Sequence, residues 1–353
     1  MKSIVIPKAG PPSILQNADK PIPEPSGSEI RIKVEAAGLN FADIMARKGL
    51  YPDAPSFPTT MGYEVAGVVD KTGPDATELL NKRVVAFTRF NSQQEYAVTP
   101  KSYTFVIPDS LSFIDAASIL VVYTTAWVLI YEMGGLRKDQ TVLIQNAGGS
   151  VGLAAIDIAL HLGAKTIGTA SGRKHDFLKS HGLHHAIDYR TENVRNRVLA
   201  ITEGKGVDLI IDPIGGKEWN VNYSLLKKTG RLGMFGASSL SDLGEMNIIS
   251  KAFAFLNFLF NMPKWSPLKL MDDNKGVFGV NLGHMFDMLE EYRGAIQGIL
   301  DGVESGWVRP VVDSVFAFED VGAAHQYMED RKNTGKIILV PTKESASSWK
   351  KQA

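Results

Sequence analysis

The chain has 353 residues, of which 44% are apolar, and this length allows two domains with separate hydrophobic cores. Its 38 basic residues balance 38 acidic ones, which argues against nucleic acid as a partner. The absence of Cys excludes disulfides, Cys-based zinc sites and thiol nucleophiles. The N-terminal segment MKSIVIPKAGPP lacks the apolar core of a secretory signal, so we expect a cytoplasmic protein.

Residues 1 to about 120 contain short β-type runs, such as 30–34, 65–69 and 83–87, which Gly and Pro interrupt. This pattern predicts a compact β-rich unit. From Asp139 onward, strands alternate with segments of helix length. The predicted strands are 141–145, 165–170, 186–188, 207–212 and 230–236, and helices are expected to begin near 151, 173, 192 and 217. Such alternation is typical of βαβ units and a parallel sheet.

The stretch KAFAFLNFLFNMPKWSPLKL, residues 251–270, is aromatic-rich and is interrupted by Pro263 and Pro267. Its longest apolar run is about a dozen residues, too short for a membrane span of about 20. Beyond it we predict a helix near 284–302, an apolar run at 310–316 and a last strand at 336–340. The polar tail is expected to fray.

The stretch VLIQNAGGSVG, residues 142–152, allows two interpretations. An apolar strand followed by Asn146-x-x-Gly149-x-x-Gly152 is typical of a turn that seats a dinucleotide pyrophosphate at a helix N-terminus. The same letters contain Gly148-x-Ser150-x-Gly152, which matches the nucleophile elbow of a serine hydrolase.

The hydrolase interpretation needs an acid and a His later in the chain, and Asp212 with His284 or His325 could supply them. An elbow normally follows several strands of its own α/β sheet and a Gly-rich oxyanion loop, whereas the residues before 140 form a separate β-rich unit. We therefore favour the dinucleotide site and keep Ser150 as the nucleophile of a less favoured alternative.

The strand after the glycine turn ends in Ser171-Gly172-Arg173-Lys174. An acidic residue at this place would accept a hydrogen bond from the ribose 2′-hydroxyl of NAD. A serine with two cations suits a 2′-phosphate instead, through charge-assisted hydrogen bonds. The sequence therefore predicts NADPH as the cofactor.

Several further stretches follow one another along nearly the whole chain. They are AAGLNFADIMARKGLYP at 36–52, GYEVAGVV at 62–69, TTAW at 124–127, IDYRTE at 187–192, DPIGG at 212–216, GVFGVNLG at 276–283 and TGKIILVP at 334–341. With these stretches and the glycine turn, the chain resembles the zinc-independent medium-chain dehydrogenase/reductases of the quinone oxidoreductase family, and within it the VAT-1-like group.

The resemblance implies an α/β fold in which a GroES-like β-barrel catalytic domain accompanies a Rossmann domain with a doubly wound parallel sheet. On this sequence, residues 1–122 would form the N-terminal part of the catalytic domain, 123–273 the NADPH-binding domain, and 274–353 the part that completes the catalytic domain. The nicotinamide would lie in the cleft between the domains, and we expect a homodimer.

The resemblance also assigns cofactor residues. They are Thr125 near the nicotinamide; Gly149, Ser150, Val151 and Gly152 at the pyrophosphate; Ser171, Lys174 and Tyr189 at the 2′-phosphate, where Arg173 joins them; and Asn281 over the nicotinamide end. Two positions depart from the family pattern, because Asn146 begins the glycine motif and Val122 replaces the usual Asn.

The zinc ligands of related alcohol dehydrogenases are missing, since the chain has no Cys and Tyr63 stands where their His would be. Alkoxide stabilisation without a Lewis acid is difficult, whereas a quinone or an enone delocalises the charge that a hydride delivers. The polar groups of the matching motif are the catalytic candidates. Asn40, Tyr51 and Tyr63 can donate hydrogen bonds to the developing oxyanion, and Asp43 is expected to orient its neighbours.

We therefore predict NADPH-dependent, metal-free reduction of small-molecule quinones or α,β-unsaturated carbonyls. The alternative is an NADPH-binding, vesicle-associated scaffold with vestigial activity. The aromatic stretch 251–270 is expected to border the cleft as a mobile lid or to form a dimer contact; membrane contact is less favoured, because Lys264 and Lys269 are few cations for a bilayer. The group His181, His184 and His185 is interpreted as a solvated loop and not as a metal site.

Overall fold

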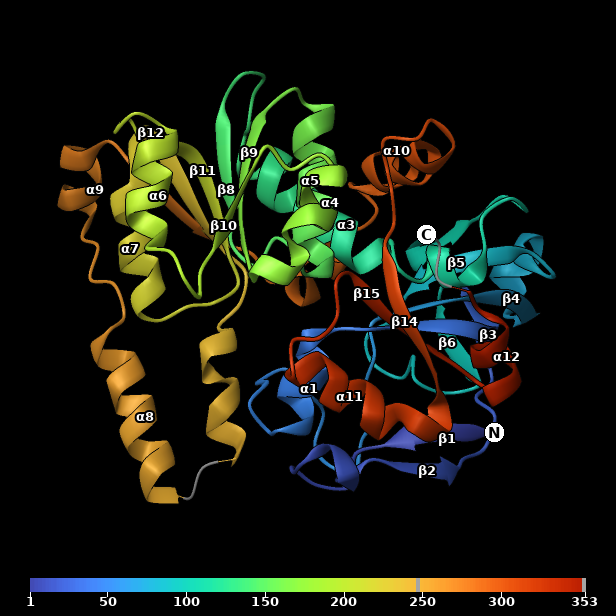
Figure 1. Ribbon diagram of the computed structural model, residues 1–353. Coiled ribbons are helices and arrows are strands. Elements are labelled where there is room, and N and C mark those ends of the chain that lie inside the picture. The colour runs from blue at the N-terminus through green and yellow to red at the C-terminus, as the bar shows by residue number, and fades with distance from the viewer. Residues whose placement is uncertain (246–247, 351–353) are drawn as a thin grey trace. The chain divides into compact units, whose positions relative to one another are not determined.

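The computed structural model describes residues 1–245 and 248–350, and the chain divides into two compact units (Figure 1). Unit 1 consists of residues 1–121, 283–304 and 310–353. Unit 2 consists of residues 122–282 and 305–309. The C-terminal segment thus belongs to the same unit as the N-terminal third.

Unit 1 is organised around β3 (Glu29–Leu39), which pairs with three other strands of a seven-stranded sheet. The remaining strands are β4 (Glu64–Thr72), β5 (Arg83–Phe87), β6 (Tyr96–Pro100), β7 (Thr104–Val106), β14 (Val312–Ala317) and β15 (Lys336–Val340). Along β3, the buried residues Ile30, Ile32 and Val34 alternate with Arg31 and Lys33. This period of two places one face of the strand in the core.

The C-terminal strand β15 closes unit 1 by pairing antiparallel with β3, with Ile338 opposite Gly38. Smaller elements surround the sheet: β1 (Lys2–Val5), β2 (Gln16–Asp19), α1 (Phe41–Arg47), α2 (Phe113–Ala116), α10 (Arg293–Glu304), α11 (Val321–Glu329) and α12 (Lys343–Ser348). The expectation of a frayed tail is therefore wrong for residues 343–348. The hydroxyl of Thr342 accepts a hydrogen bond from the N–H of Ser345 at 3.2 Å and caps α12.

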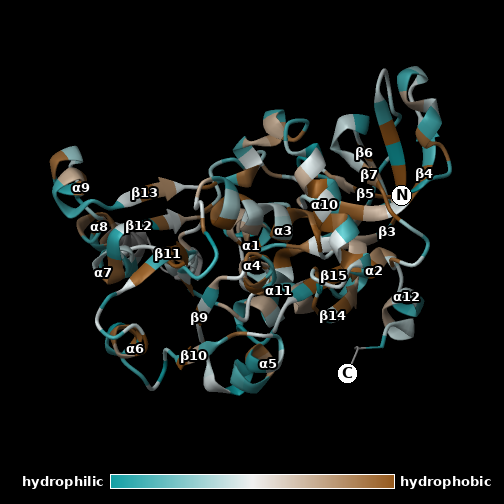
Figure 2. Cartoon of the chain, turned by 90° about the horizontal axis from the view of Figure 1, so that it is seen from above, coloured by the Kyte–Doolittle hydropathy of each residue, from teal (hydrophilic) through white to brown (hydrophobic). Residues whose placement is uncertain are grey.

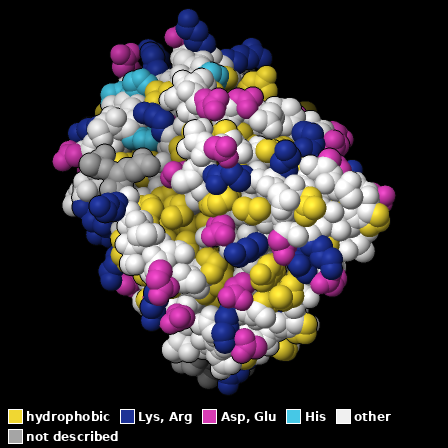
Figure 3. All heavy atoms as spheres, turned by 90° about the vertical axis from the view of Figure 1, so that its right-hand side faces the viewer, with side chains coloured by type: hydrophobic (Ala, Val, Ile, Leu, Met, Phe, Trp, Pro, Cys, Tyr) yellow, Lys and Arg dark blue, Asp and Glu magenta, His cyan; other side chains and the backbone are white. Residues whose placement is uncertain are grey.

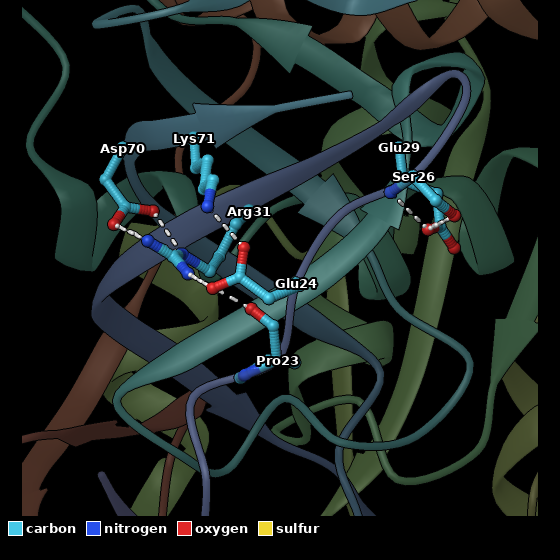
Figure 4. A network of polar contacts seen from close by, with 7 residues as sticks. All are labelled: Pro23, Glu24, Ser26, Glu29, Arg31, Asp70 and Lys71. Atoms are coloured by element: carbon cyan, nitrogen blue, oxygen red, sulfur yellow. Dashed lines mark hydrogen bonds and ion pairs between the residues drawn. The ribbon is translucent and has the colours of Figure 1, made fainter. Parts of the chain in front are cut away.

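A cluster of charges fixes the loop that precedes β3 (Figure 4). The Arg31 guanidinium donates to both carboxylate oxygens of Asp70 on β4 and, at 2.9 Å, to Glu24 in the loop. Lys71 contacts the other Glu24 oxygen. Asp70 raises the pKa of Arg31 above its ordinary value, and the two-oxygen contact gives the pair a defined geometry.

Unit 2 contains a six-stranded sheet in which every pairing is parallel. Its strands are β8 (Thr141–Ile144), β9 (Lys165–Ala170), β10 (His185–Asp188), β11 (Val207–Asp212), β12 (Leu226–Met234) and β13 (Gly276–Gly279). The spatial order is β10-β9-β8-β11-β12-β13. This is the strand order of a dinucleotide-binding sheet: successive strands are added on one side of β8 as far as β10, and from β11 onward on its other side.

The helices of unit 2 are α3 (Leu120–Trp127), which begins in unit 1, α4 (Ser150–His161), α5 (His175–Ser180), α6 (Val194–Ile201), α7 (Lys217–Leu225), α8 (Ile248–Phe260) and α9 (Pro267–Asp273).

The helix α6 carries both polar and apolar residues on its surface (Figure 2). Its Val198 is buried in the core, while Arg195 and Arg197 are exposed. The predicted alternation of strands and helices is thus confirmed.

The domain boundary lies later than the sequence suggests. The sequence predicts it after residue 273, but β13 pairs with β12 from Arg231 opposite Gly276 to Met234 opposite Gly279, so residues 274–282 belong to unit 2. Residues 305–309 also return to unit 2. A four-residue edge strand with a Gly at each end gives little local signal, because its pairing partner alone makes it a strand.

The aromatic stretch 251–270 is largely helical. Phe258 of α8 contacts Trp219 edge to face, and Trp265 stacks on Tyr223 with ring centroids 5.0 Å apart. On the other side, Phe253 and Phe260 are 70% and 80% exposed. Phe258 and Trp265 therefore anchor the segment to α7, while Phe253 and Phe260 remain exposed.

Residues 113–132 form the one stretch of the described chain that is long and apolar enough to cross a membrane. However, 72% of its apolar window is buried inside the structure. A core helix of this composition gives the same pattern, so the stretch carries no membrane assignment.

The stability of unit 1 should depend on His325. This side chain on α11 is fully buried, and neither ring nitrogen has a hydrogen-bond partner among the described residues. Burial, aided by the positive charge of Arg47, lowers its pKa to about 3. The unfolded chain then binds this proton more readily, so stability is lost as the pH falls below the ordinary value of 6.5.

We expect the His325→Leu variant to lose less stability than the unmodified chain between pH 6.5 and pH 4.5, by roughly 2 kcal/mol. Urea unfolding at a series of pH values measures this difference. His161→Gln at an exposed position is the control. Parallel pH profiles for His325→Leu and the unmodified chain would contradict the expectation.

Candidate cofactor and active site

The glycine turn between β8 and α4 has the geometry of a phosphate-binding turn. Asn146 adopts a left-handed conformation with φ of 55°, and its carbonyl accepts the N–H of Gly149. A Cβ on Gly152 would lie 2.6 Å from the Asn146 carbonyl oxygen, so the helix packs closely against the turn only because Gly has none.

No side-chain hydrogen bond caps the N-terminus of α4 in this part of the described chain. The first N–H groups of the helix, those of Ser150, Val151 and Gly152, therefore lack intrahelical partners and can receive an anion. The turn thus brings Gly149 and these three predicted residues together at one helix end.

A series of hydrogen bonds between buried polar groups holds the glycine turn in place. The Thr169 hydroxyl on β9 accepts the N–H of Asn146 at 3.2 Å and donates to Gln145 at 2.6 Å. Gln145 donates to Asn222 on α7, which donates to Asp212 at the end of β11. The carboxyl ends of β8, β9 and β11 are thereby tied together.

These contacts weaken the hydrolase interpretation. The carboxylate of Asp212 accepts hydrogen bonds from Asn222 and from the N–H groups of Ile214 and Gly215, and not from a His. His284 pairs with Asp53. Ser150 is the first residue of a regular helix and does not occupy a strained elbow.

The residues predicted for the 2′-phosphate lie at the same edge of the sheet. Ser171 follows β9, and its carbonyl accepts the N–H of Lys174. The Lys174 stem lies against the glycine turn, since a Cβ on Gly148 would be 2.7 Å from its Cδ. Tyr189 follows β10, the neighbour of β9, and is 42% exposed.

Sequence reasoning missed Asp188, which precedes Tyr189. Its Oδ2 accepts the N–H of Gly172 at 3.0 Å, so a carboxylate reaches the loop between Ser171 and Arg173. The signal lay in the stretch IDYRTE, but only the pairing of β10 with β9 brings Asp188 to this loop.

The nicotinamide-end residues take separate positions. Thr125 is buried in α3, and Asn281 is exposed two residues after the end of β13. The N–H of Val280 donates to Met234 at 2.8 Å, which places Asn281 at the carboxyl end of β12. Both residues belong to unit 2.

In unit 1, Asn40 lies at the start of α1, and its side chain is held from both sides. Its Nδ2 donates to Glu64 at 3.2 Å, and its Oδ1 accepts from Lys336 at 2.7 Å. Lys336 also forms an ion pair with Glu64 at 2.5 Å, and both side chains are almost completely buried. The second Glu64 oxygen accepts the N–H of Val121.

Sequence reasoning also missed Glu64 and Lys336. Each is a charged residue within an apolar strand, in the stretches GYEVAGVV and TGKIILVP. A charge in such a run is a signal for a buried pair, but the partner is 272 residues away in the sequence and only the fold reveals it.

Asp43 and Tyr63 are buried near Asn40. The Asp43 carboxylate accepts the N–H of Asn40 at 2.8 Å, and desolvation raises its pKa to about 7. Desolvation, and then the charge of Asp43, raise the pKa of the Tyr63 phenol far above its ordinary range. The Tyr51 ring meets that of Tyr63 edge to face at 6.4 Å. A protonated phenol therefore lies beside a carboxyl group that titrates near neutrality.

The interpretation of His181, His184 and His185 as a solvated loop is wrong for His181. This side chain is buried, and its Nε2 lies 3.1 Å from Asp157, which also receives Arg309 and the Tyr123 hydroxyl. The approach of residues 305–309 to α4 creates this environment, which local sequence does not reveal. Among residues 1–245 and 248–350, no group of three or more His, Asp or Glu side chains is arranged to hold a metal.

Comparisons with known proteins agree with this architecture. Residues 26–109 match the family described as alcohol dehydrogenase GroES-like domain, and residues 181–339 match the family described as zinc-binding dehydrogenase. The human synaptic vesicle membrane protein VAT-1 homolog is 35% identical over 93% of this chain and 82% of its own length. A quinone oxidoreductase of Pseudomonas aeruginosa is 30% identical over 94% of this chain and 97% of its own.

The crystal structure of Escherichia coli quinone oxidoreductase complexed with NADPH has a TM-score of 0.85 with this chain. It is 27% identical and covers 97% of this chain and 100% of its own. The predicted fold class, a GroES-like domain with a Rossmann domain, is confirmed. On the sequence identity, the two family matches and the sheet order, this chain belongs to the medium-chain dehydrogenase/reductase family, together with the VAT-1 homologs and the quinone oxidoreductases.

Proposed function

We propose that this chain is an NADPH-dependent, zinc-independent reductase of quinones or α,β-unsaturated carbonyls. The observation that supports the proposal is the carboxyl end of the sheet in unit 2, where α4 begins without a side-chain cap and the Lys174 stem lies against the glycine turn. Ser171 and Tyr189 follow the neighbouring strands β9 and β10. An anion-binding turn beside a second, cation-lined site matches the pyrophosphate and the 2′-phosphate of NADPH.

The residues present fit the cofactor. The N–H groups of Ser150, Val151 and Gly152 would hold the pyrophosphate, with Gly149 allowing close approach. Ser171, Arg173, Lys174 and Tyr189 would hold the 2′-phosphate, and Thr125 and Asn281 would position the nicotinamide. When bound, NADPH supplies a hydride to an electrophilic carbon.

The side chains of unit 1 would supply the proton that accompanies reduction. Tyr63 remains protonated at neutral pH, so it can donate to the oxygen of a reduced acceptor, with Tyr51 beside it. We assign to Asp43, with a pKa of about 7, the role of restoring this proton. Asn40 would position this group, because its amide is already held by Glu64 and Lys336.

Zinc independence is part of the proposal. The chain has no Cys and therefore no thiolate ligand for zinc, and Tyr63, Asp43 and Asn40 supply a phenol, a carboxyl group and an amide. Quinones and enones need only hydrogen bonding at the developing oxyanion, so the residues present suffice for that chemistry.

A second candidate is an NADPH-binding scaffold on a vesicle surface, and the exposed apolar side chains of α8 and α9 favour it. Phe253, Leu256, Phe260, Leu268 and Met271 are each more than 60% exposed. The same exposed side chains could instead form a homodimer contact or belong to a lid, as we expect from the sequence. Basic and acidic side chains are interspersed on the face that Figure 3 shows.

Purified protein with NADPH and a panel of quinones and enones tests the activity. We expect loss of absorbance at 340 nm with at least one acceptor, and the rate should be unchanged after dialysis against a chelator. Tight NADPH binding without turnover of any acceptor would favour the scaffold. Loss of activity on chelation, restored by zinc, would contradict zinc independence.

Cofactor preference should depend on Lys174. Two charge-assisted contacts to a phosphate, at roughly 1.5 to 3 kcal/mol each, favour NADPH over NADH by at least about tenfold. Lys174→Met keeps the stem that packs on Gly148 and removes the charge. We expect NADPH binding to weaken while NADH binding is unchanged, as followed by fluorescence titration. Equal losses for both cofactors would mean that Lys174 only supports the turn.

The raised pKa of Asp43 predicts a pH-dependent cost to stability. The pKa of Asp43 is about 7 in the folded chain and has the ordinary value of 3.8 in the unfolded chain. The contribution of Asp43 to stability is therefore greatest at low pH and is lost as the pH rises towards 7. Asp43→Asn keeps the acceptor for the Asn40 N–H. Its unfolding free energy relative to the unmodified chain should rise by roughly 2 kcal/mol between pH 5.5 and pH 8.5.

Chemical denaturation at both pH values measures this change, and Asp176→Asn at an exposed position is the control. The same Asp43→Asn protein should turn over acceptors more slowly with an unchanged Kd for NADPH, since Asp43 acts on the proton and not on the cofactor. A difference in stability that does not vary with pH would show that Asp43 is ionised throughout this range.

A further inference from the structure

The cofactor edge of unit 2 contains a negative charge as well as the predicted cations. Asp188 is the last residue of β10, and its backbone lies opposite Ala170 at the end of β9. Residues that end neighbouring parallel strands share the edge at which dinucleotides bind. Asp188 therefore enters the region assigned to the adenosine ribose from the neighbouring strand.

The carboxylate of Asp188 is fixed by two backbone groups. Its Oδ2 accepts the N–H of Gly172 at 3.0 Å, and its Oδ1 accepts the N–H of Arg190 at 3.0 Å. A Cβ on Gly172 would lie 2.7 Å from Oδ2, so the carboxylate approaches the backbone closely at this position. The carboxylate is thus held within the loop that connects Ser171 to Arg173, and the next residue is Tyr189.

Asp188 is ionised at neutral pH. The hydrogen bond from the Arg190 N–H, opposed by some desolvation and assisted by the Gly172 N–H and His175, lowers its pKa below the ordinary value. Hydrogen bonds that stabilise the charged form keep a carboxylate ionised. A 2′-phosphate bound by Ser171, Lys174 and Tyr189 would then face a like charge within the same loop.

We propose that Asp188 is a specificity-determining residue that weakens the binding of NADPH relative to NADH. The preference for NADPH over NADH is then smaller than the cations of the loop would produce without Asp188. This inference rests on the proposed 2′-phosphate site. The carboxylate repels a phosphate and can accept a hydrogen bond from the 2′-hydroxyl of NADH. The site would thereby combine an acidic residue of the kind that binds the 2′-hydroxyl in NAD sites with basic residues of the kind that bind the 2′-phosphate in NADP sites.

The competing explanation is that Asp188 only holds the loop in place through Gly172. Asp188→Asn distinguishes the two, because an amide oxygen can still accept a backbone N–H while the charge is lost. Glu203→Gln is the matched control. It removes one exposed carboxylate from the loop before β11, at the opposite edge of the same parallel sheet.

The experiment measures the Kd of NADPH and of NADH by fluorescence titration of the full chain, at low salt and at about 0.5 M salt. For Asp188→Asn at low salt, we expect NADPH to bind roughly three- to tenfold more tightly than to the unmodified chain. The Kd of NADH should stay within about twofold of its unmodified value or should increase. The gain for NADPH should shrink at high salt, because screening reduces the repulsion. Glu203→Gln should leave both Kd values unchanged.

An unchanged or weaker NADPH affinity in Asp188→Asn, or an equal change for both cofactors, would overturn the proposal and assign Asp188 to the scaffold of the loop. The readout is binding, so a chain that binds NADPH without reducing any acceptor still decides the question. An unmodified chain that binds neither cofactor would overturn the proposed function and this inference together. Unchanged affinity for NADPH in Lys174→Met alongside a gain in Asp188→Asn would leave the inference standing and place the phosphate elsewhere in the cluster.

Discussion

The buried ion pair between Glu64 and Lys336 is the constraint on which unit 1 depends. It joins β4 to β15, which are 272 residues apart in the sequence, and it requires the C-terminal strand to complete the sheet. Two charges in an apolar interior are tolerated only as a pair with further hydrogen bonds, and loss of one partner typically costs about 3 to 5 kcal/mol. Asn40 and the Val121 N–H supply those further bonds. The pair therefore fixes the start of α1, and with it Asp43, and also the first turn of α3.

Unit 2 depends on a different constraint, the common direction of its strands. Because all six strands are parallel, the residues that follow β8, β9 and β10 reach one edge of the sheet. Thr169 and Gln145 tie that edge internally, and Gly152 lets α4 approach the turn. The cofactor site thus needs no side chain of unusual reactivity. It needs backbone N–H groups, close packing of α4 against the glycine turn, and charged side chains nearby. The strand order brings these together at the carboxyl end of the sheet.

The proposed chemistry divides between these two constraints. Unit 2 offers contacts for a dinucleotide, and unit 1 offers a protonated phenol beside a carboxyl group with a pKa near 7. Burial produces both perturbed groups, since desolvation is the largest cause of each shift. The exposed half of α8 and α9 belongs to neither constraint. Phe253 and Phe260 of α8 remain exposed, whereas Phe258 and Trp265 contact α7.

The sequence by itself determined the local features of this protein: the β-rich N-terminal third, the alternation of strands and helices, the glycine turn and the cations after β9. These follow from periodicity, Gly and charge, which act over a few residues. The tertiary structure alone decided which distant residues meet. It placed β13 in the sheet of unit 2, buried His181 against Asp157, paired Glu64 with Lys336, and brought Asp188 to Gly172. Each of these depends on strand order or burial, and a residue acquires such a partner only when segments remote in the chain pack together.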